Sequence, residues 1–126
     1  MLIAGRPTRT IWPEPGGAAV GVLDQRALPH RVSQVHIGNV TEATRAIADM
    51  TVRGAPLVGV TAAYGLALQA RTDASDAALD AAAHQLKSAR PTAVNLAWAV
   101  DRTRAHLREL AMPDRAAAAW AFAGRL

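Results

Sequence analysis

The sequence contains no cysteine, few aromatic residues and a single lysine. Without cysteine, the chain has no disulfide bond, no thiolate metal site and no thiol nucleophile. Aromatic residues make up 4% of the chain, and its 14 basic residues, all arginine except Lys87, are scattered along its length. A nucleic-acid interface usually needs a dense basic patch. The composition therefore argues against a nucleic-acid partner, and we expect most of the arginines to be solvated.

A long, strongly apolar run is also lacking. Residues 54–70 carry no charge, but they include Pro56, internal glycines and polar residues. A membrane-spanning helix usually needs about 20 predominantly apolar residues. We therefore interpret this segment as a buried core helix and expect no membrane partner. The apolar run in residues 1–7 is too short for an export signal, which favours a cytoplasmic protein.

What the chain does contain is typical of one globular domain, spanning residues 1–126. Hydrophobic residues make up 51% and charged residues 19% of the sequence, a composition that favours a packed core over disorder. Alanine supplies much of the apolar content and favours helices. His30 and His36 have no other metal-ligand residues at useful spacing, so we interpret both as surface or hydrogen-bonding residues. We predict no metal site and no cofactor.

The pattern of apolar residues divides the domain into two parts. Short runs at 9–12, 18–23 and 31–37, separated by turn residues, predict three short strands within residues 1–40. Helical periodicity follows over residues 41–126. Helices are expected to start after a Thr41 cap, at Pro56, after an Asp73 cap, after Pro91 and at Pro113. The fold class is therefore α+β, with a small three-stranded antiparallel sheet followed by a bundle of about five helices.

The segment Arg53-Gly54-Ala55-Pro56 is the strongest candidate for a binding site. Proline favours the first turn of a helix, and the amides of residues 57–59 would then be unpaired donors at a helix start. Such a start carries partial positive charge and can hold a phosphate. Gly54 permits close approach to the backbone, and a guanidinium can clamp an anion. From the residues alone, an ordinary helix start with a solvated arginine explains the same pattern.

Three ordered motifs add a family resemblance. Residues 52–65 (Val-Arg-Gly-Ala-Pro-Leu-Val-Gly-Val onward), residues 23–29 (Leu-Asp-Gln-Arg-Ala-Leu-Pro) and residues 90–99 (Arg-Pro-Thr-Ala-Val-Asn-Leu onward) closely resemble motifs of methylthioribose-1-phosphate isomerases. These enzymes belong to the family that includes the regulatory subunits of translation initiation factor 2B. The resemblance runs from about residue 11 to about residue 108, and the isomerase branch fits better than the initiation-factor branch.

The resemblance implies a substrate-binding role for Arg53, Gly54, Ala55 and Arg90, with a sugar phosphate as the partner. The implied reaction converts methylthioribose 1-phosphate to methylthioribulose 1-phosphate in methionine salvage. In the family, the catalytic cysteine and aspartate lie in a following Rossmann-like domain. That domain is absent from these 126 residues, so we identify the chain as an amino-terminal domain with no catalytic residue of its own.

The other motif residues, Asp24, Gln25 and Asn95, are interpreted as structural residues that fix turns and helix caps. Three hypotheses remain for the chain as a whole. It is the amino-terminal part of an isomerase, a stand-alone sugar-phosphate or nucleotide-binding module, or a regulatory interaction domain like those of initiation factor 2B. We also expect an exposed apolar face on the final helix, at residues 116–122, through which the chain associates.

Overall fold

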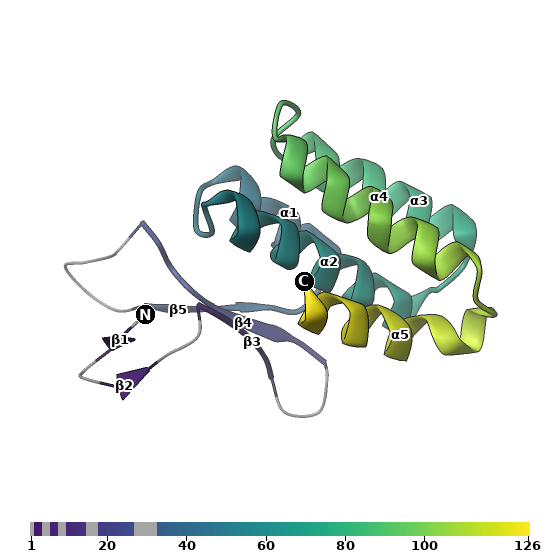
Figure 1. The fold of residues 1–126 in the computed structure, drawn as a ribbon, viewed down its shortest axis with the longest axis horizontal. Helices are drawn as coiled ribbons and strands as arrows, with labels where there is room; N and C mark the ends of the chain where they lie inside the picture. The colour runs from purple at the N-terminus through teal and green to yellow at the C-terminus, as the bar shows by residue number, and fades with distance from the viewer. Residues whose placement is uncertain (1, 4–5, 8–9, 15–17, 27–32) are drawn as a thin grey trace.

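The computed structural model describes residues 2–3, 6–7, 10–14, 18–26 and 33–126 and shows a small sheet beside a helical bundle (Figure 1). The predicted α+β architecture, with a three-stranded antiparallel sheet and five helices, is confirmed. The strands are β1 (Leu2–Ile3), β2 (Arg6–Pro7), β3 (Ile11–Pro13), β4 (Val20–Leu23) and β5 (Gln34–Ile37). The helices are α1 (Val40–Ala48), α2 (Ala55–Thr72), α3 (Asp76–Ser88), α4 (Val94–Arg108) and α5 (Met112–Arg125).

The sheet has the order β3-β4-β5 with antiparallel pairing throughout. All four residues of the central strand β4 are buried. Gly21 lies opposite Trp12, and a Cβ atom at Gly21 would be 2.5 Å from the indole ring, so only glycine fits beneath it. The hairpin β1-β2 was not predicted. The turn expected around residues 15–17, the end of the 23–29 motif, His30 and the start of the third strand lie outside the described residues.

Helix α2 forms the centre of the bundle and contacts each of the other four helices (Figure 1). A Cβ atom on Gly59 would lie 3.2 Å from Ala99 Cβ, and one on Gly65 would lie 3.1 Å from Ala43 Cβ. These two glycines therefore let α4 and α1 approach closely. The prediction of a buried core helix at residues 54–70 is confirmed, since most of α2 is buried. Across the described parts of the chain, no helix is long and apolar enough to span a membrane.

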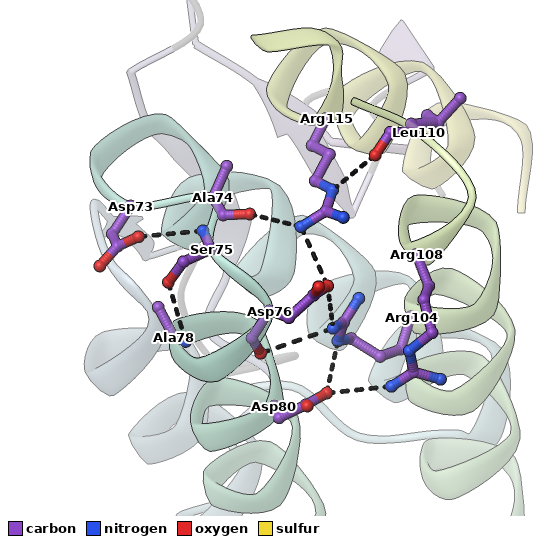
Figure 2. Close-up of polar contacts among 10 residues, drawn as sticks. All are labelled: Asp73, Ala74, Ser75, Asp76, Ala78, Asp80, Arg104, Arg108, Leu110 and Arg115. Atoms are coloured by element: carbon purple, nitrogen blue, oxygen red, sulfur yellow. Dashed lines mark hydrogen bonds and ion pairs between the residues drawn. The ribbon is translucent and has the colours of Figure 1, made fainter. Parts of the chain in front are cut away.

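Two buried arginines connect α3, α4 and α5 (Figure 2). Arg104 donates from Nε to Asp80 Oδ1 at 2.7 Å and from Nη2 to Asp76 Oδ1 at 2.9 Å. Arg115 donates to the carbonyl oxygens of Ala74 and Leu110, and its Nη1 lies 3.0 Å from Asp76 Oδ1. The hydrogen bond from Arg104 holds the pKa of Asp76 below its usual value. The expectation of solvated arginines is wrong for these two, because carboxylates on α3 pair with them.

Pro56 and Pro113 lie in the first turns of α2 and α5, as predicted, whereas the other three predicted helix starts are displaced by two or three residues. Asn39, not Thr41, caps α1, because its Oδ1 accepts the amide of Glu42 at 2.8 Å. Ser75, not Asp73, caps α3. Helix α4 begins at Val94 rather than directly after Pro91, since the preceding residues form a turn closed by the Ala93 amide and the Arg90 carbonyl at 3.0 Å.

Candidate anion-binding site

The first turn of α2 presents amide groups that have no acceptor within the helix. Gly54 is the N-cap, with φ of 91°, a left-handed conformation that favours glycine. The Val58 amide donates to the Gly54 carbonyl at 3.0 Å, which begins the helical bonding pattern. Because Pro56 has no N–H, the donors of this turn that lack helical acceptors are the amides of Ala55 and Leu57. The expectation that the amides of Val58 and Gly59 are unpaired is wrong.

The first turn of α4 is similar. Its N-cap is Ala93, whose side chain makes no capping bond, and the Ala97 amide donates to the Ala93 carbonyl at 3.2 Å. The amides of residues 94–96 therefore lack helical acceptors. Gly54, Ala55, Arg90 and residues 93–96 line one hollow of about 310 Å³, which we call the Arg90 hollow. Two uncapped helix starts thus face the same space, and both place partial positive charge there.

Arg90 is half-buried beside this hollow. Its Nε donates to the Ile47 carbonyl at 2.8 Å, at the end of α1, and its Nη2 donates to the Val52 carbonyl at 3.0 Å. The guanidinium therefore holds the loop between α1 and α2 in place while it lines the hollow. This structural role was not visible in the sequence, because residues 47 and 52 are distant along the chain.

Arg53 is exposed and lines a neighbouring hollow of about 370 Å³ with Gln25, Leu57, Thr10 and the β3 residue Ile11. Gly54 lines both this Arg53 hollow and the Arg90 hollow. The structure therefore brings Gly54, Ala55 and Arg90 to one space and places Arg53 at the adjoining one. That these four residues bind substrate stays a prediction.

Asn95 is the residue at this site that sequence reasoning misjudged. It was expected to fix a cap, but Ala93 occupies the cap position and Asn95 is exposed in the first turn of α4. Asn95 lines the Arg90 hollow and also an apolar groove of about 440 Å³ that includes Trp98 and Leu126. The sequence did carry a signal that Asn95 lines the site, since it is a polar residue inside a motif for which the family resemblance implies substrate binding. Asp24 does fix a turn, since its Oδ1 accepts the Arg26 amide at 2.9 Å.

Large exposed apolar side chains lie in the first turns of α4, whereas the large side chains of residues 116–122 are partly buried. Val94 is 79% and Trp98 52% exposed, whereas Trp120 and Phe122 are partly buried. Trp120 packs edge-on against the buried ring of Tyr64, with 5.1 Å between centroids. Trp120 on α5 is turned onto α2, while Ala117 and Ala121 remain exposed, so an apolar face at residues 116–122 is not contradicted. Association through an exposed apolar face stays a prediction.

The described residues hold no group of three or more His, Asp or Glu side chains arranged to bind a metal ion. An acidic side chain, Asp49, lies at the end of α1, four residues before Arg53. Burial tends to raise the pKa of the Asp49 carboxyl, but hydrogen bonds from the hydroxyl and amide of Thr51 outweigh it and bring the pKa below its usual value. Asp49 is therefore charged at neutral pH.

Comparisons with known proteins show which family the chain belongs to. A family model described as the initiation factor 2 subunit family matches residues 51–119. A methylthioribose-1-phosphate isomerase of Methylocella silvestris is 55% identical over 124 residues, covering 98% of this chain and 34% of that enzyme. An uncharacterized protein in the petC 3' region of Rhodospirillum rubrum is 46% identical over 126 residues, covering 100% of this chain and 68% of that protein.

Two solved structures share the fold. The 5-methylthioribose 1-phosphate isomerase of Pyrococcus horikoshii OT3 superimposes with a TM-score of 0.82 and 34% identity, covering 95% of this chain and 36% of the other. The delta subunit of translation initiation factor eIF-2B from A. fulgidus gives a TM-score of 0.83 and 33% identity, covering 94% and 36%. The chain spans about a third of the length of these isomerases. The chain therefore belongs to the initiation factor 2 subunit family, and its sequence corresponds to about one third of a methylthioribose-1-phosphate isomerase.

Proposed function

We propose that this chain forms the amino-terminal, substrate-phosphate-binding part of a methylthioribose-1-phosphate isomerase. The observation that carries the proposal is the meeting of two uncapped helix starts, from α2 and α4, at the Arg90 hollow. The 55% identity to an isomerase over 98% of this chain supports the same reading. Binding takes place without a cofactor, and a cytoplasmic location stays a prediction.

A phosphate group is the ligand that this arrangement suits best. A phosphomonoester offers three oxygens, which accept hydrogen bonds from the amides of Ala55, Leu57 and the first turn of α4. Arg53 and Arg90 flank these amides and supply positive charge from two sides. Charge-assisted bonds to a guanidinium are among the stronger hydrogen bonds in proteins. The sugar then extends over the exposed mouth of the hollows.

The first test replaces Arg53 with alanine. Arg53→Ala is expected to weaken binding of methylthioribose 1-phosphate by about 30- to 150-fold, because a hydrogen bond to a charged group contributes roughly 2–3 kcal/mol. The ligand is titrated into ¹⁵N-labelled protein, and the amide shifts of Gly54, Ala55, Leu57 and residues 94–96 are followed by NMR. Arg45→Ala is the matched control, since it removes the same charge from an exposed position on α1.

The control should bind as the parent does. If the parent shows no amide shifts at the two helix starts, the proposed phosphate site is wrong. If the parent binds and Arg53→Ala binds equally well, Arg53 does not belong to the site.

The second test asks whether this chain catalyses the reaction. Moving hydrogen between neighbouring sugar carbons needs a positioned acid and base, and uniform phosphate binding does not accelerate that step. The family resemblance implies a cysteine and an aspartate from a second domain for this work, and the 126 residues contain no cysteine. We therefore expect no ketose product above background in a coupled assay with the purified chain. Turnover that Arg53→Ala abolishes would contradict this expectation.

An alternative function is favoured by the likeness to the delta subunit of eIF-2B. In that case the chain is a regulatory interaction domain and its hollows hold no phosphate. A stand-alone sugar-phosphate or nucleotide-binding module is the other alternative, and it retains the phosphate site. Titration with methylthioribose 1-phosphate, adenosine monophosphate and inorganic phosphate separates these cases. Preference for the first ligand supports the isomerase part, preference for the nucleotide supports the module, and no binding supports the interaction domain.

A further inference from the structure

We propose that Asp49 is a positioning residue for Arg53, and that it acts by fixing the loop of residues 49–54, which we call the Arg53 loop. The inference rests on the proposed function, because it assigns to Asp49 the task of presenting Arg53 to a phosphate. Asp49 lies four residues before Arg53, at the end of α1, and lines none of the three hollows described above. Its effect on binding is therefore indirect.

The Asp49 carboxylate holds the first half of the loop from within. Its Oδ1 accepts the Thr51 amide at 2.9 Å and the Thr51 hydroxyl at 2.6 Å. These two bonds span Met50, which has φ of 68°. A left-handed conformation is strained for a residue with a side chain and persists only where neighbouring contacts enforce it. The paired bonds to Thr51 are the contacts that enforce it here.

A second set of contacts ties the same loop to the end of β4. Asp24 accepts bonds from Arg26 Nε at 3.0 Å and Nη2 at 2.8 Å, a bidentate pair. The remaining nitrogen of Arg26, Nη1, reaches Asp49 Oδ2 at 3.4 Å. The Gln25 amide also donates to the Thr51 carbonyl at 2.8 Å. Residues 24–26 of the 23–29 motif, for which the proposed function has no direct use, thus hold the Arg53 loop against the sheet.

The opposite side of the loop is held by the bundle. Val52 is fully buried, its amide donates to the Ala46 carbonyl at 3.2 Å, and its carbonyl accepts from Arg90 Nη2. Residues 49–52 are therefore fixed on both sides, whereas Arg53 and Gly54 are exposed. An exposed arginine pays a large entropic cost when it is immobilised by a ligand. A fixed backbone directly before Arg53 reduces the conformational entropy that is lost when phosphate binds.

The test measures phosphate affinity and loop order in the same set of proteins. Inorganic phosphate is titrated into the ¹⁵N-labelled 126-residue chain, and the ¹H–¹⁵N heteronuclear NOE of the Arg53 and Gly54 amides is recorded without phosphate. Asp49→Ala is expected to weaken phosphate binding about tenfold, on the scale of one lost charge-assisted hydrogen bond, and to lower both NOE values. Asp49→Asn retains the Oδ1 acceptor for Thr51 and should stay within about threefold of the parent.

Asp73→Ala is the matched control. Asp73 ends α2, and its Oδ1 accepts the Ser75 amide at 2.9 Å, so it makes the same bond two residues ahead in a different loop (Figure 2). Its removal should lower thermal stability by a similar amount and leave phosphate affinity and the NOE values at Arg53 unchanged. Arg26→Gln, which keeps Asp49 and Thr51 intact, provides a second variant should Asp49→Ala fail to fold, and it should weaken binding about threefold.

The outcomes separate this inference from the proposed function. If the parent does not bind phosphate, the proposed function fails, and no residue positions Arg53 for an anion. If the parent binds and Arg53→Ala does not, but Asp49→Ala and Arg26→Gln bind as the parent does with unchanged NOE values, the positioning role is overturned alone. Equal losses of phosphate affinity in Asp49→Ala and Asp73→Ala would show that Asp49 supports only the general stability of the fold.

Discussion

Leu86→Ala is expected to lower the free energy of unfolding by about 2–5 kcal/mol, the usual range for truncation of a buried leucine. Leu86 has no exposed surface and lies on α3 where that helix crosses α2. Its two methyl carbons would be 3.2 and 3.4 Å from a Cβ atom on Gly65. The glycine makes room for the leucine, so removal of the leucine leaves a cavity against bare backbone. Urea-induced unfolding followed by far-UV circular dichroism measures the loss.

The same contact predicts the sign of a coupling. Gly65→Ala alone should destabilise the protein, because its new methyl group meets Leu86 and also Ala43 Cβ at 3.1 Å. In the Leu86→Ala background that methyl group enters the cavity, so the double variant should be more stable than the two single losses imply. Gly124→Ala, where the nearest atom is the Tyr64 hydroxyl oxygen at 3.5 Å, is the control and should not be destabilising. Strict additivity at Gly65 and Leu86 would contradict this packing.

Arg104→Ala is the second change with a large expected effect, a loss of about 2–4 kcal/mol. The side chain of Arg104 is only 5% exposed, so truncation removes buried packing as well as bonds to two carboxylates. Arg108→Ala is the matched control, because Arg108 binds the same Asp80 Oδ1 at 3.1 Å with a side chain that is 58% exposed. An exposed pair contributes less than about 1 kcal/mol. Equal losses in the two variants would show that burial of Arg104 contributes nothing.

The pH dependence of the free energy of unfolding tests the role of Arg104 independently. The hydrogen bond from Arg104 lowers the pKa of Asp76 in the folded state. A depressed carboxyl pKa contributes stability that is present above the unfolded value of about 3.9 and is lost as the pH falls through the folded value. In Arg104→Ala this contribution shrinks, so stability should fall less steeply with acid below about pH 4 than it does in the parent. The Arg108→Ala variant should keep the parental slope.

Much of the fold was predictable because its signals are local. Each signal is a pattern of adjacent residues: the uncharged run at residues 54–70, the prolines near helix starts and the short apolar runs before residue 40. The buried arginines were not predictable, because their burial depends on carboxylates 24 or more residues away. On α4, Arg104 and Arg108 lie one helical turn apart and share Asp80, yet one is buried and the other exposed. Periodicity alone does not distinguish them.

The candidate site, like the fold, was predictable from the sequence only where its signals are local. Gly54 and Ala55 were located correctly at a helix start, since the sequence carries that information within four residues. The choice of free amides was wrong because the N-cap is Gly54, and this sets the first bonded amide at Val58. The contacts of Arg90 with the Ile47 and Val52 carbonyls form only in the folded tertiary structure, and the same holds for the bond from Arg26 to Asp49. No sequence pattern specifies such distant pairs.

The central position of α2 has a consequence for cooperativity. Because this helix contacts all four others, its interior cannot open without disrupting its packing against each of them. The amide hydrogens in the middle of α2 should therefore exchange with solvent only through global unfolding. The donors proposed to hold the phosphate lie at the first turn of that same helix. Phosphate binding there should stabilise the folded state relative to the unfolded state, so exchange of the amides in the middle of α2 should slow as the phosphate site fills.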